Sequence, residues 1–511
     1  MPTAMAQPEQ ARARRGAFAT VLAAEFWERF GYYGMQAILG LFMVEHLHRG
    51  DAETNLLLGA LALLTYAFPV LGGWLGDRVL GTRPALVAGA VGLTAGYGLL
   101  AWGAQTDSTQ LVMGALSLIA LANGLFKPNA GTLVRRLFAG DDGALDAAFT
   151  LYYMSVNVGS TCSMLIMPWL QQSQGPAVAF GACSLGLAGG TALFLARAKG
   201  IVAYLHAHNP LHSQEASTLK KHVALLLIPG LALLWALGAL VLADARLARW
   251  CVLLCCVGLV AVAVWLWRGT AMAEKPGLLL TYVLCAQTTA YQVFYQQMQT
   301  SLTLFALRDV SGVFRLGHWV LFTWSPGQFQ SLNPLWVMVF SPLLAAFYTW
   351  RRQHGGAPSM VLRMLLGYGF VAAGYILWWW AATWVKGLVS PWVMVGGYGL
   401  VSLGELLTIG MGLAVIARYG PPRASAILMG IVCLLWGVGM YAGSLVANLA
   451  ALPATAAGGE GAVLYGRLFG FLSWGALALC LVIACMAPWT MRLERRCRSL
   501  NEAALGEPLG S

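Results

Sequence analysis

The sequence predicts an all-α polytopic membrane protein, and three observations support this fold class. The chain of 511 residues is 59% hydrophobic and only 10% charged, whereas a soluble domain has roughly 25% charged residues. Apolar runs of about 20 residues, long enough to cross a hydrocarbon core, recur along nearly the whole chain. The alternating strands of about ten residues that mark a membrane β-barrel are absent. This composition disfavours a soluble enzyme, a DNA-binding protein and a disordered chain.

Fourteen apolar segments, separated by polar breaks or by breaks containing Gly and Pro, are predicted as membrane spans. They run approximately over 18–46, 55–78, 84–104, 109–138, 145–170, 177–198, 222–243, 248–268, 277–307, 330–351, 358–384, 389–418, 423–450 and 463–489. The seventh and eighth carry ionisable residues only at their ends, so we interpret them as lipid-facing accessory helices. The other twelve form six plus six, the usual count for two pseudo-symmetric halves of a transporter.

This pattern divides the chain into five expected parts. They are a cytoplasmic tail (1–17), an N-terminal six-helix bundle (18–198), a linker with the two accessory helices (199–276), a C-terminal six-helix bundle (277–490) and a second cytoplasmic tail (491–511). Lys and Arg between the spans favour the side that holds both termini by about three to one. Because such residues stay on the cytoplasmic side, we expect both termini inside the cell.

The formal charge of +11 arises from 31 Lys and Arg against 20 Asp and Glu. These basic residues lie in short loops and form no stripe, so nucleic-acid binding is disfavoured. Nearly all of the ten Cys lie inside apolar segments, and no Cys/His cluster has metal-ligand spacing. We therefore expect no disulfide, no metal and no cofactor.

Charged residues inside the spans are the strongest functional signal, because each costs about 2.5–3.5 kcal/mol near the bilayer centre. The first span reads AAEFWERFGYYGMQAIL and carries Glu25, Glu28, Arg29 and Tyr32 at helical spacing. These residues share one helix face. The opposing effects of the neighbouring charges leave at least one acid poised to take up a proton, as a proton-driven carrier requires.

Two further charges complete the pattern. Lys127 precedes the helix-disrupting Pro128 in the fourth span, and Glu405 stands alone in the apolar run SLGELL of the tenth. Arg29 and Lys127 suit a carboxylate, whereas Glu405 suits an ammonium group, so the arrangement suggests a zwitterionic ligand. The alternative is a set of structural ion pairs, although such pairs seldom need five charges on three helices.

Several motifs resemble the proton-dependent oligopeptide transporter (POT/PTR) family of the major facilitator superfamily. EFWERFGYYG resembles the family's ExxERFxYY motif, and GGWLGDRVLGTR resembles the superfamily loop between the second and third spans. KPN at 127–129, FTLYYMSVNVG, QSLNPLW and SLGELL extend the resemblance from about 18 to 450.

The resemblance implies a major facilitator fold of 12 core helices plus two accessory helices. It implies a symporter, not an enzyme, that imports di- and tripeptides with protons across the bacterial inner membrane. We also expect the protein to function as a monomer. Transferred residue by residue, the roles are proton coupling by Glu25 and Glu28, carboxylate binding by Arg29, Lys127 and Tyr33, amine binding by Glu405, Asn157 and Asn333, and pocket lining by Tyr32, Tyr66, Gln36, Gln296 and Trp436. A same-fold carrier of another small organic substrate, or an uncoupled facilitator, stays open as the alternative.

Two departures from the family pattern are visible. Many members have Arg and Glu where this chain has Gln36 and Gln296, and those two charges can close an extracellular gate. A contact between two Gln side chains is neutral and does not respond to protonation, so coupling here is expected to rest more on Glu25 and Glu28. Val432 replaces a Trp of the family, and Trp436, one helical turn later, can substitute in part.

Overall fold

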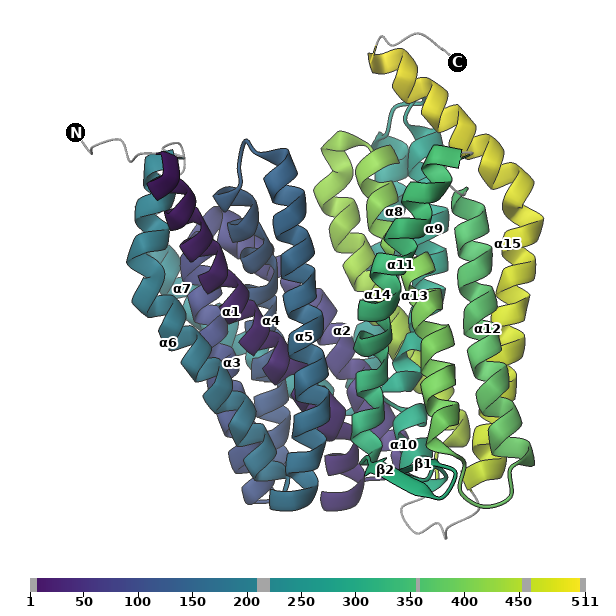
Figure 1. Ribbon diagram of the computed structural model, residues 1–511. Coiled ribbons are helices and arrows are strands. Elements are labelled where there is room, and N and C mark those ends of the chain that lie inside the picture. Colours follow the sequence, from purple (N-terminus) through teal and green to yellow (C-terminus); the bar gives the residue numbers. More distant parts are fainter. Residues whose placement is uncertain (1–6, 209–220, 355–358, 453–460, 506–511) are drawn as a thin grey trace. The chain divides into compact units, whose positions relative to one another are not determined.

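The computed structural model describes residues 7–208, 221–354, 359–452 and 461–505 (Figure 1). Its long helices, in chain order, are α1 (Gln7–Leu41), α2 (Asp51–Leu75), α3 (Thr82–Gln105), α4 (Thr109–Leu137), α5 (Asp142–Gln174), α6 (Pro176–His208), α7 (Lys221–Ala243), α8 (Ala245–Gly269), α9 (Lys275–Tyr295), α11 (Leu332–His354), α12 (Met360–Trp384), α13 (Pro391–Tyr419), α14 (Ser425–Ala447) and α15 (Gly461–Leu505). Shorter elements are the helix α10 (Ser301–Arg308) and the strands β1 (Val313–Leu316) and β2 (Trp319–Thr323).

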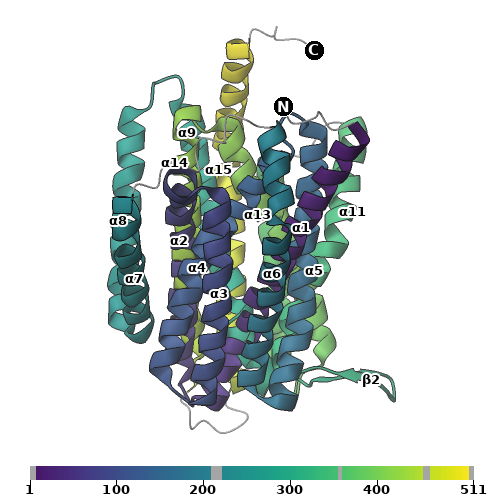
Figure 2. The same ribbon diagram turned by 90° about the vertical axis from the view of Figure 1, so that its left-hand side faces the viewer.

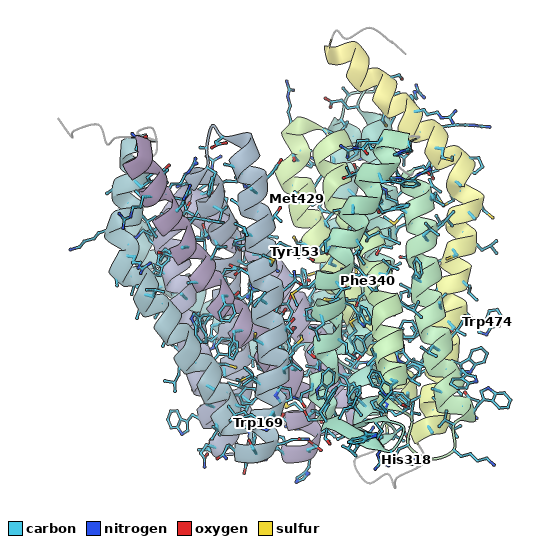
Figure 3. All side chains as sticks on the ribbon, viewed as in Figure 1. Tyr153, Trp169, His318, Phe340, Met429 and Trp474 are labelled. Carbon is cyan, nitrogen blue, oxygen red and sulfur yellow. The ribbon has the colours of Figure 1, made fainter. Side chains whose placement is uncertain are left out.

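Ten helices among the described residues are long and apolar enough to cross a membrane, namely α2, α3, α4, α6, α8, α11, α12, α13, α14 and α15. The helices α1, α5 and α9 are not among these ten, and the apolar part of α7, Leu227–Ala243, is shorter. Apolar side chains point outward along these helices, as Trp474 does on α15 (Figure 3). The predicted all-α polytopic membrane fold is confirmed.

Several helices run beyond the expected spans. The helix α1 begins at Gln7, inside the segment expected to be a tail, α6 reaches His208, and α15 continues to Leu505. Backbone hydrogen bonding does not stop where a sequence becomes polar, so hydropathy marks the apolar part of a helix and not its ends. The expected span 277–307 is interrupted, because a 3₁₀ turn, Gln296–Met298, separates α9 from α10.

The chain forms two compact units, 1–47 with 64–247, and 48–63 with 248–511. The beginning of α2 thus packs with the second unit, and α7 with the first. The expected division into two bundles and a separate linker stays a prediction, but the accessory helices do not form a unit of their own.

In the first unit, α1 packs against α5 and α6, and α3 packs against α4 and α6. Gly159 of α5 faces α1 so closely that an added Cβ would lie 2.8 Å from the carbonyl oxygen of Phe26. The helix α7 is fastened to α4, where Trp235 donates to the Gly114 carbonyl at 2.8 Å and Ser117 donates to the Trp235 carbonyl at 2.7 Å. These contacts hold the charged face of α1 against α4 and α5.

In the second unit, α12 lies between α13 and α15, and α9 packs against α13 and α14. Tyr375 of α12 donates to the Phe294 carbonyl at 2.8 Å. The antiparallel strands β1 and β2 form a hairpin between α10 and α11. This packing places the polar face of α13 beside α11, where the second group of candidate residues lies.

Candidate functional site

The three charges of α1 form one buried cluster in the first unit. Arg29 donates through Nε to Glu28 and lies 3.3 Å from Glu25 Oε1. Their side chains are 0–3% exposed. The opposite oxygen of Glu28 accepts a hydrogen bond of 2.7 Å from Asn123 of α4. The sequence-predicted face of α1 is therefore an interacting group of two acids and one base.

Two polar atoms of this cluster have no hydrogen-bond partner among the described residues: Glu25 Oε2 and Arg29 Nη2. Buried donors and acceptors nearly always have hydrogen-bond partners in proteins. An acceptor and a donor that both lack a partner therefore mark a place for a ligand or water. The Nε of the Arg29 guanidinium contacts the two acids, and its Nη2 is a donor that can bind a carboxylate.

Lys127 lies on α4, one turn after Asn123. Its Nζ is 5.3 Å from the centroid of the Tyr66 ring, and its charge acts on Glu28. The side chain is exposed, which differs from the buried ammonium that the apolar sequence around it indicates. An exposed ammonium keeps its hydration and avoids the cost of burying an unpaired charge.

Aromatic and amide groups surround the cluster. The Arg29 guanidinium lies 5.5 Å from the Tyr32 ring centroid and 5.9 Å from that of Tyr33. Gln36 donates to the Tyr32 hydroxyl at 2.9 Å. Asn157 of α5 donates to the Tyr153 carbonyl at 2.9 Å, so its amide is anchored to its own helix.

The second unit holds the isolated acid of the sequence. Glu405 on α13 accepts a hydrogen bond of 2.7 Å from Asn333 of α11, and the same amide lies 3.0 Å from the Ser402 hydroxyl. Among the described residues no Lys or Arg forms an ion pair with Glu405. Its carboxylate is half-buried and oriented by Asn333, so it is arranged to accept a cation from outside the chain.

Two other expected residues of the second unit have partners of their own. Trp436 of α14 lies 3.3 Å from the Thr288 hydroxyl of α9, and Gln296 donates to Ser444 at 3.1 Å. Both side chains are buried. They tie α14 to α9 and its continuation, which is a packing role that the sequence alone did not indicate.

Comparison with known proteins shows the family of the chain. Residues 83–463 match the profile of the POT family. The chain belongs to the POT family. It is 34% identical over 443 residues to dipeptide and tripeptide permease A of Proteus mirabilis, covering 86% of this chain and 87% of that protein. It is 32% identical over 483 residues to dipeptide and tripeptide permease A of Salmonella typhimurium, covering 94% and 93%.

Solved structures give the same assignment. Tetrameric PepTSo2 matches with a TM-score of 0.83 and 36% identity over 94% of this chain and 99% of that one. A bacterial homologue of the human drug peptide transporters PepT1 and PepT2 matches with a TM-score of 0.80 and 36% identity over the same shares. This POT family member is therefore a membrane transporter and not an enzyme.

Two residues that the sequence pattern did not single out orient the charges of this transporter. Asn123 lies one turn before Lys127 and binds Glu28, and Ser402 lies three residues before Glu405 and contacts Asn333. A signal was available, because a polar side chain three or four residues from an intramembrane charge shares its helix face.

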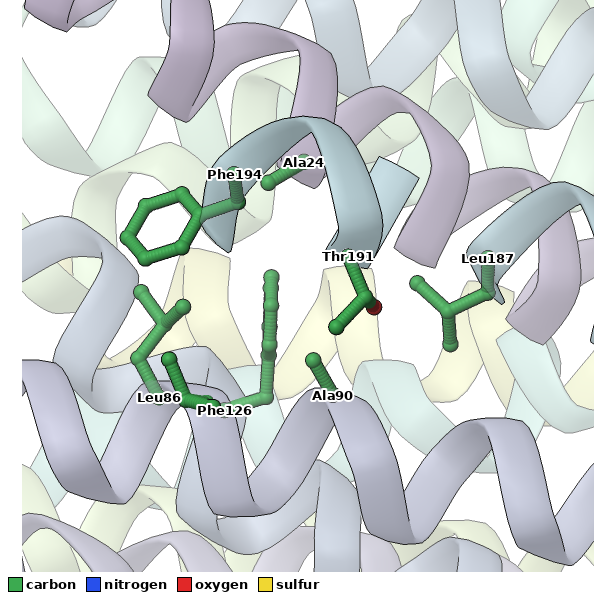
Figure 4. A pocket seen from close by; sticks show the side chains of 8 residues that line it. Ala24, Leu86, Ala90, Phe126, Leu187, Thr191 and Phe194 are labelled. Atoms are coloured by element: carbon green, nitrogen blue, oxygen red, sulfur yellow. The ribbon is translucent and has the colours of Figure 1, made fainter. Parts of the chain in front are cut away.

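A small pocket in the first unit is a separate feature. Figure 4 shows it between α1, α3, α4 and α6, lined by Ala24, Leu86, Val87, Ala90, Phe126, Leu187, Thr191 and Phe194. Thr191 supplies the one polar side chain of this lining. Ala24 and Phe126 precede Glu25 and Lys127 in the sequence, but no charged side chain lines the pocket, so it is a packing gap and not a site for a charged ligand.

A second ion pair in this POT family member joins the beginning of α2 to α10. Arg308 donates to both oxygens of Asp51 at 2.6 and 2.7 Å and to the Tyr465 hydroxyl at 2.8 Å. Asp51 also accepts from the Leu452 backbone at 3.0 Å. Asp51 is 2% exposed and Arg308 is 23% exposed. We call these side chains, Asp51, Arg308 and Tyr465, the Asp51 cluster.

Arg308→Gln is expected to lower the stability of the protein by about 3–5 kcal/mol, because it leaves the carboxylate of Asp51 buried without its cation. Thermal unfolding in detergent measures the effect as a lower Tm. Arg49→Gln is the matched control, since Arg49 pairs with the exposed Glu53 and surface pairs contribute at most about 1 kcal/mol. Equal Tm values for the two variants would contradict a stabilising role of the Asp51 cluster.

Proposed function

We propose that this chain is a proton-coupled symporter that imports di- and tripeptides across the bacterial inner membrane by alternating access. The proposal rests on two groups of opposite charge, one in each unit, that have unfilled binding capacity. The first unit holds Arg29 with an unpaired donor next to Lys127, and the second holds Glu405 with no cation among the described residues. A peptide with free termini carries the two complementary charges. The permeases that resemble this chain are named for di- and tripeptides.

The peptide carboxylate is assigned to the first unit. Arg29 offers the unpaired Nη2, and Lys127 offers an accessible ammonium beside the ring of Tyr66. A carboxylate between these cations forms charge-assisted hydrogen bonds, which are stronger than neutral ones. Tyr33, Tyr32 and Tyr66 supply amphipathic surface beside the cations, suited to a peptide backbone and to varied side chains.

The peptide amine is assigned to the second unit. Glu405 supplies the charge, and Asn333 fixes the direction of its carboxylate with a hydrogen bond of 2.7 Å. Asn157 adds an amide from the first unit. Gln36, Gln296 and Trp436 are assigned to the uncharged lining of the pocket, where Gln296 and Trp436 also hold α14 against α9 and its continuation.

Proton coupling is assigned to Glu25 and Glu28. When both are ionised, they hold Arg29 through Nε. Protonation of one acid weakens that pairing, so Arg29 can bind the peptide carboxylate together with Lys127. The bound peptide then links the two halves, which move about it to open inward. After the peptide leaves, the proton is released and the internal pairs form again.

The topology follows from the positions of the basic residues. We propose that both termini are cytoplasmic and that the six-helix bundles 18–198 and 277–490 are the moving halves, with 199–276 as the accessory linker. Each copy contains both charged groups, which supports a functional monomer. The similar PepTSo2 was solved as a tetramer, so assembly and transport are separate questions.

Uptake of a labelled dipeptide into liposomes containing the purified protein tests the proposal. With an inwardly directed proton gradient, the peptide is expected to accumulate above its external concentration, because proton entry supplies the free energy. Without the gradient it should only equilibrate. Equal uptake in both conditions would indicate an uncoupled facilitator, and no uptake would indicate another substrate. Liposomes without protein provide the background.

A further inference from the structure

The hairpin of β1 and β2 presents an apolar surface that the transport site does not use. Its strands pair antiparallel, with Leu316 opposite Trp319. All residues of β2 are exposed, from 44% at Phe322 to 79% at Trp319, and Leu316 is 68% exposed. A two-stranded sheet is marginally stable in water by itself, and exposed apolar strands are prone to aggregate. We therefore expect another apolar surface to contact this hairpin and remove it from water.

The base of the hairpin is fixed to the end of two membrane helices. Val389, between α12 and α13, exchanges backbone hydrogen bonds of 2.8 Å with Ser311 and Asp309. Trp392 at the start of α13 donates to the Arg315 carbonyl at 3.0 Å. The buried Phe314 ring lies 5.2 Å from that of Trp392. These contacts hold the hairpin at the level where α12 ends and α13 begins.

The hairpin runs in the direction expected for a segment that lies along a membrane surface. Figure 2 shows β2 extending sideways at the level of the helix ends of its own unit, across the helix direction. In Figure 3, His318 of the connecting turn lies at this lower end. Trp384, the last residue of α12, is 74% exposed. Tryptophans at span ends typically lie in the lipid headgroup region.

We propose that the hairpin lies on the bilayer and inserts Leu316, Trp319 and Leu321 into the headgroup region. The charge pattern supports a phospholipid surface as the occupant. Residues 310–329 contain no Asp or Glu, and Arg315, His318 and Lys386 are exposed around the hairpin. Basic side chains bind lipid phosphate while the neighbouring apolar side chains leave water. The hairpin thereby anchors the connection between α10 and α11 to the membrane.

Fluorine NMR of protein labelled with 5-fluorotryptophan, in nanodiscs that hold one copy each, tests the proposal. The Trp319 line is assigned as the line lost in Trp319→Phe. A nitroxide on the upper acyl chain of the lipid should broaden this line beyond detection, whereas a water-soluble paramagnetic chelate should leave it visible. Trp378, which is fully buried and assigned with Trp378→Phe, is the control that the aqueous chelate should leave visible and that the lipid nitroxide should broaden less than Trp319.

Broadening of the Trp319 line by the aqueous chelate and not by the lipid nitroxide would overturn the proposal, because the hairpin would then lie in water. A line affected by neither agent would also overturn it, because Trp319 would then be covered by protein. Both results are independent of transport activity, so a failure of this inference leaves the proposed function untouched.

Discussion

Glu28→Gln is expected to abolish proton-driven accumulation of peptide while peptide exchange continues. Glu28 is fully buried, binds Arg29 and accepts a hydrogen bond from Asn123. Glutamine has the same shape but carries no charge and cannot exchange a proton. The variant is therefore fixed in a state that resembles the protonated acid, in which Arg29 is free to hold the peptide.

Two liposome assays separate these effects. Uptake under a proton gradient should fall to the level reached without a gradient, whereas exchange of labelled for unlabelled peptide across the membrane should persist. Glu53→Gln is the matched control, because Glu53 is exposed and pairs only with Arg49 among the described ion pairs. Normal gradient-driven accumulation in Glu28→Gln would remove Glu28 from the coupling scheme and leave Glu25 as the candidate.

Glu405→Gln is expected to weaken binding of peptides with a free amino terminus at least about 30-fold. Loss of one partner of a buried charge pair costs about 2–5 kcal/mol, and about 1.4 kcal/mol corresponds to a factor of ten in Kd. Glutamine retains an acceptor for Asn333, so the local hydrogen bond of 2.7 Å can persist. The loss should therefore come from the missing charge.

Competition assays with two peptides test this assignment. A free dipeptide should lose affinity for Glu405→Gln, whereas the same dipeptide with an acetylated amino terminus should bind both forms equally weakly. Glu274→Gln, at the exposed start of α9, should leave both affinities unchanged. An equal loss for the free and the acetylated peptide would show that Glu405 acts on the structure of the pocket and not on the amine.

The helical class, the approximate spans and the charged candidate residues of this protein could be predicted from its sequence because the chain lies in a membrane. Because the hydrocarbon core forces each span to satisfy its own backbone as a helix, long apolar runs predicted the helical class and the approximate spans. The same cost of burying charge made Glu25, Glu28, Arg29 and Glu405 stand out. The spacing of Glu25, Glu28 and Arg29 on α1 predicted a shared face, and in the structure both acids form ion pairs with Arg29.

The tertiary structure decided how those charges are partnered. Asn123 and Asn333 come from helices far away in the sequence and orient Glu28 and Glu405, and the Asp51 cluster joins residues more than 250 positions apart. Hydropathy also failed to show that the start of α2 packs with the second unit. Helical periodicity fixes which residues share a face of one helix, but the partner of that face depends on side-chain packing between distant segments. The sequence by itself therefore determined the fold class and the charged residues, and only the tertiary structure determined which groups hold them.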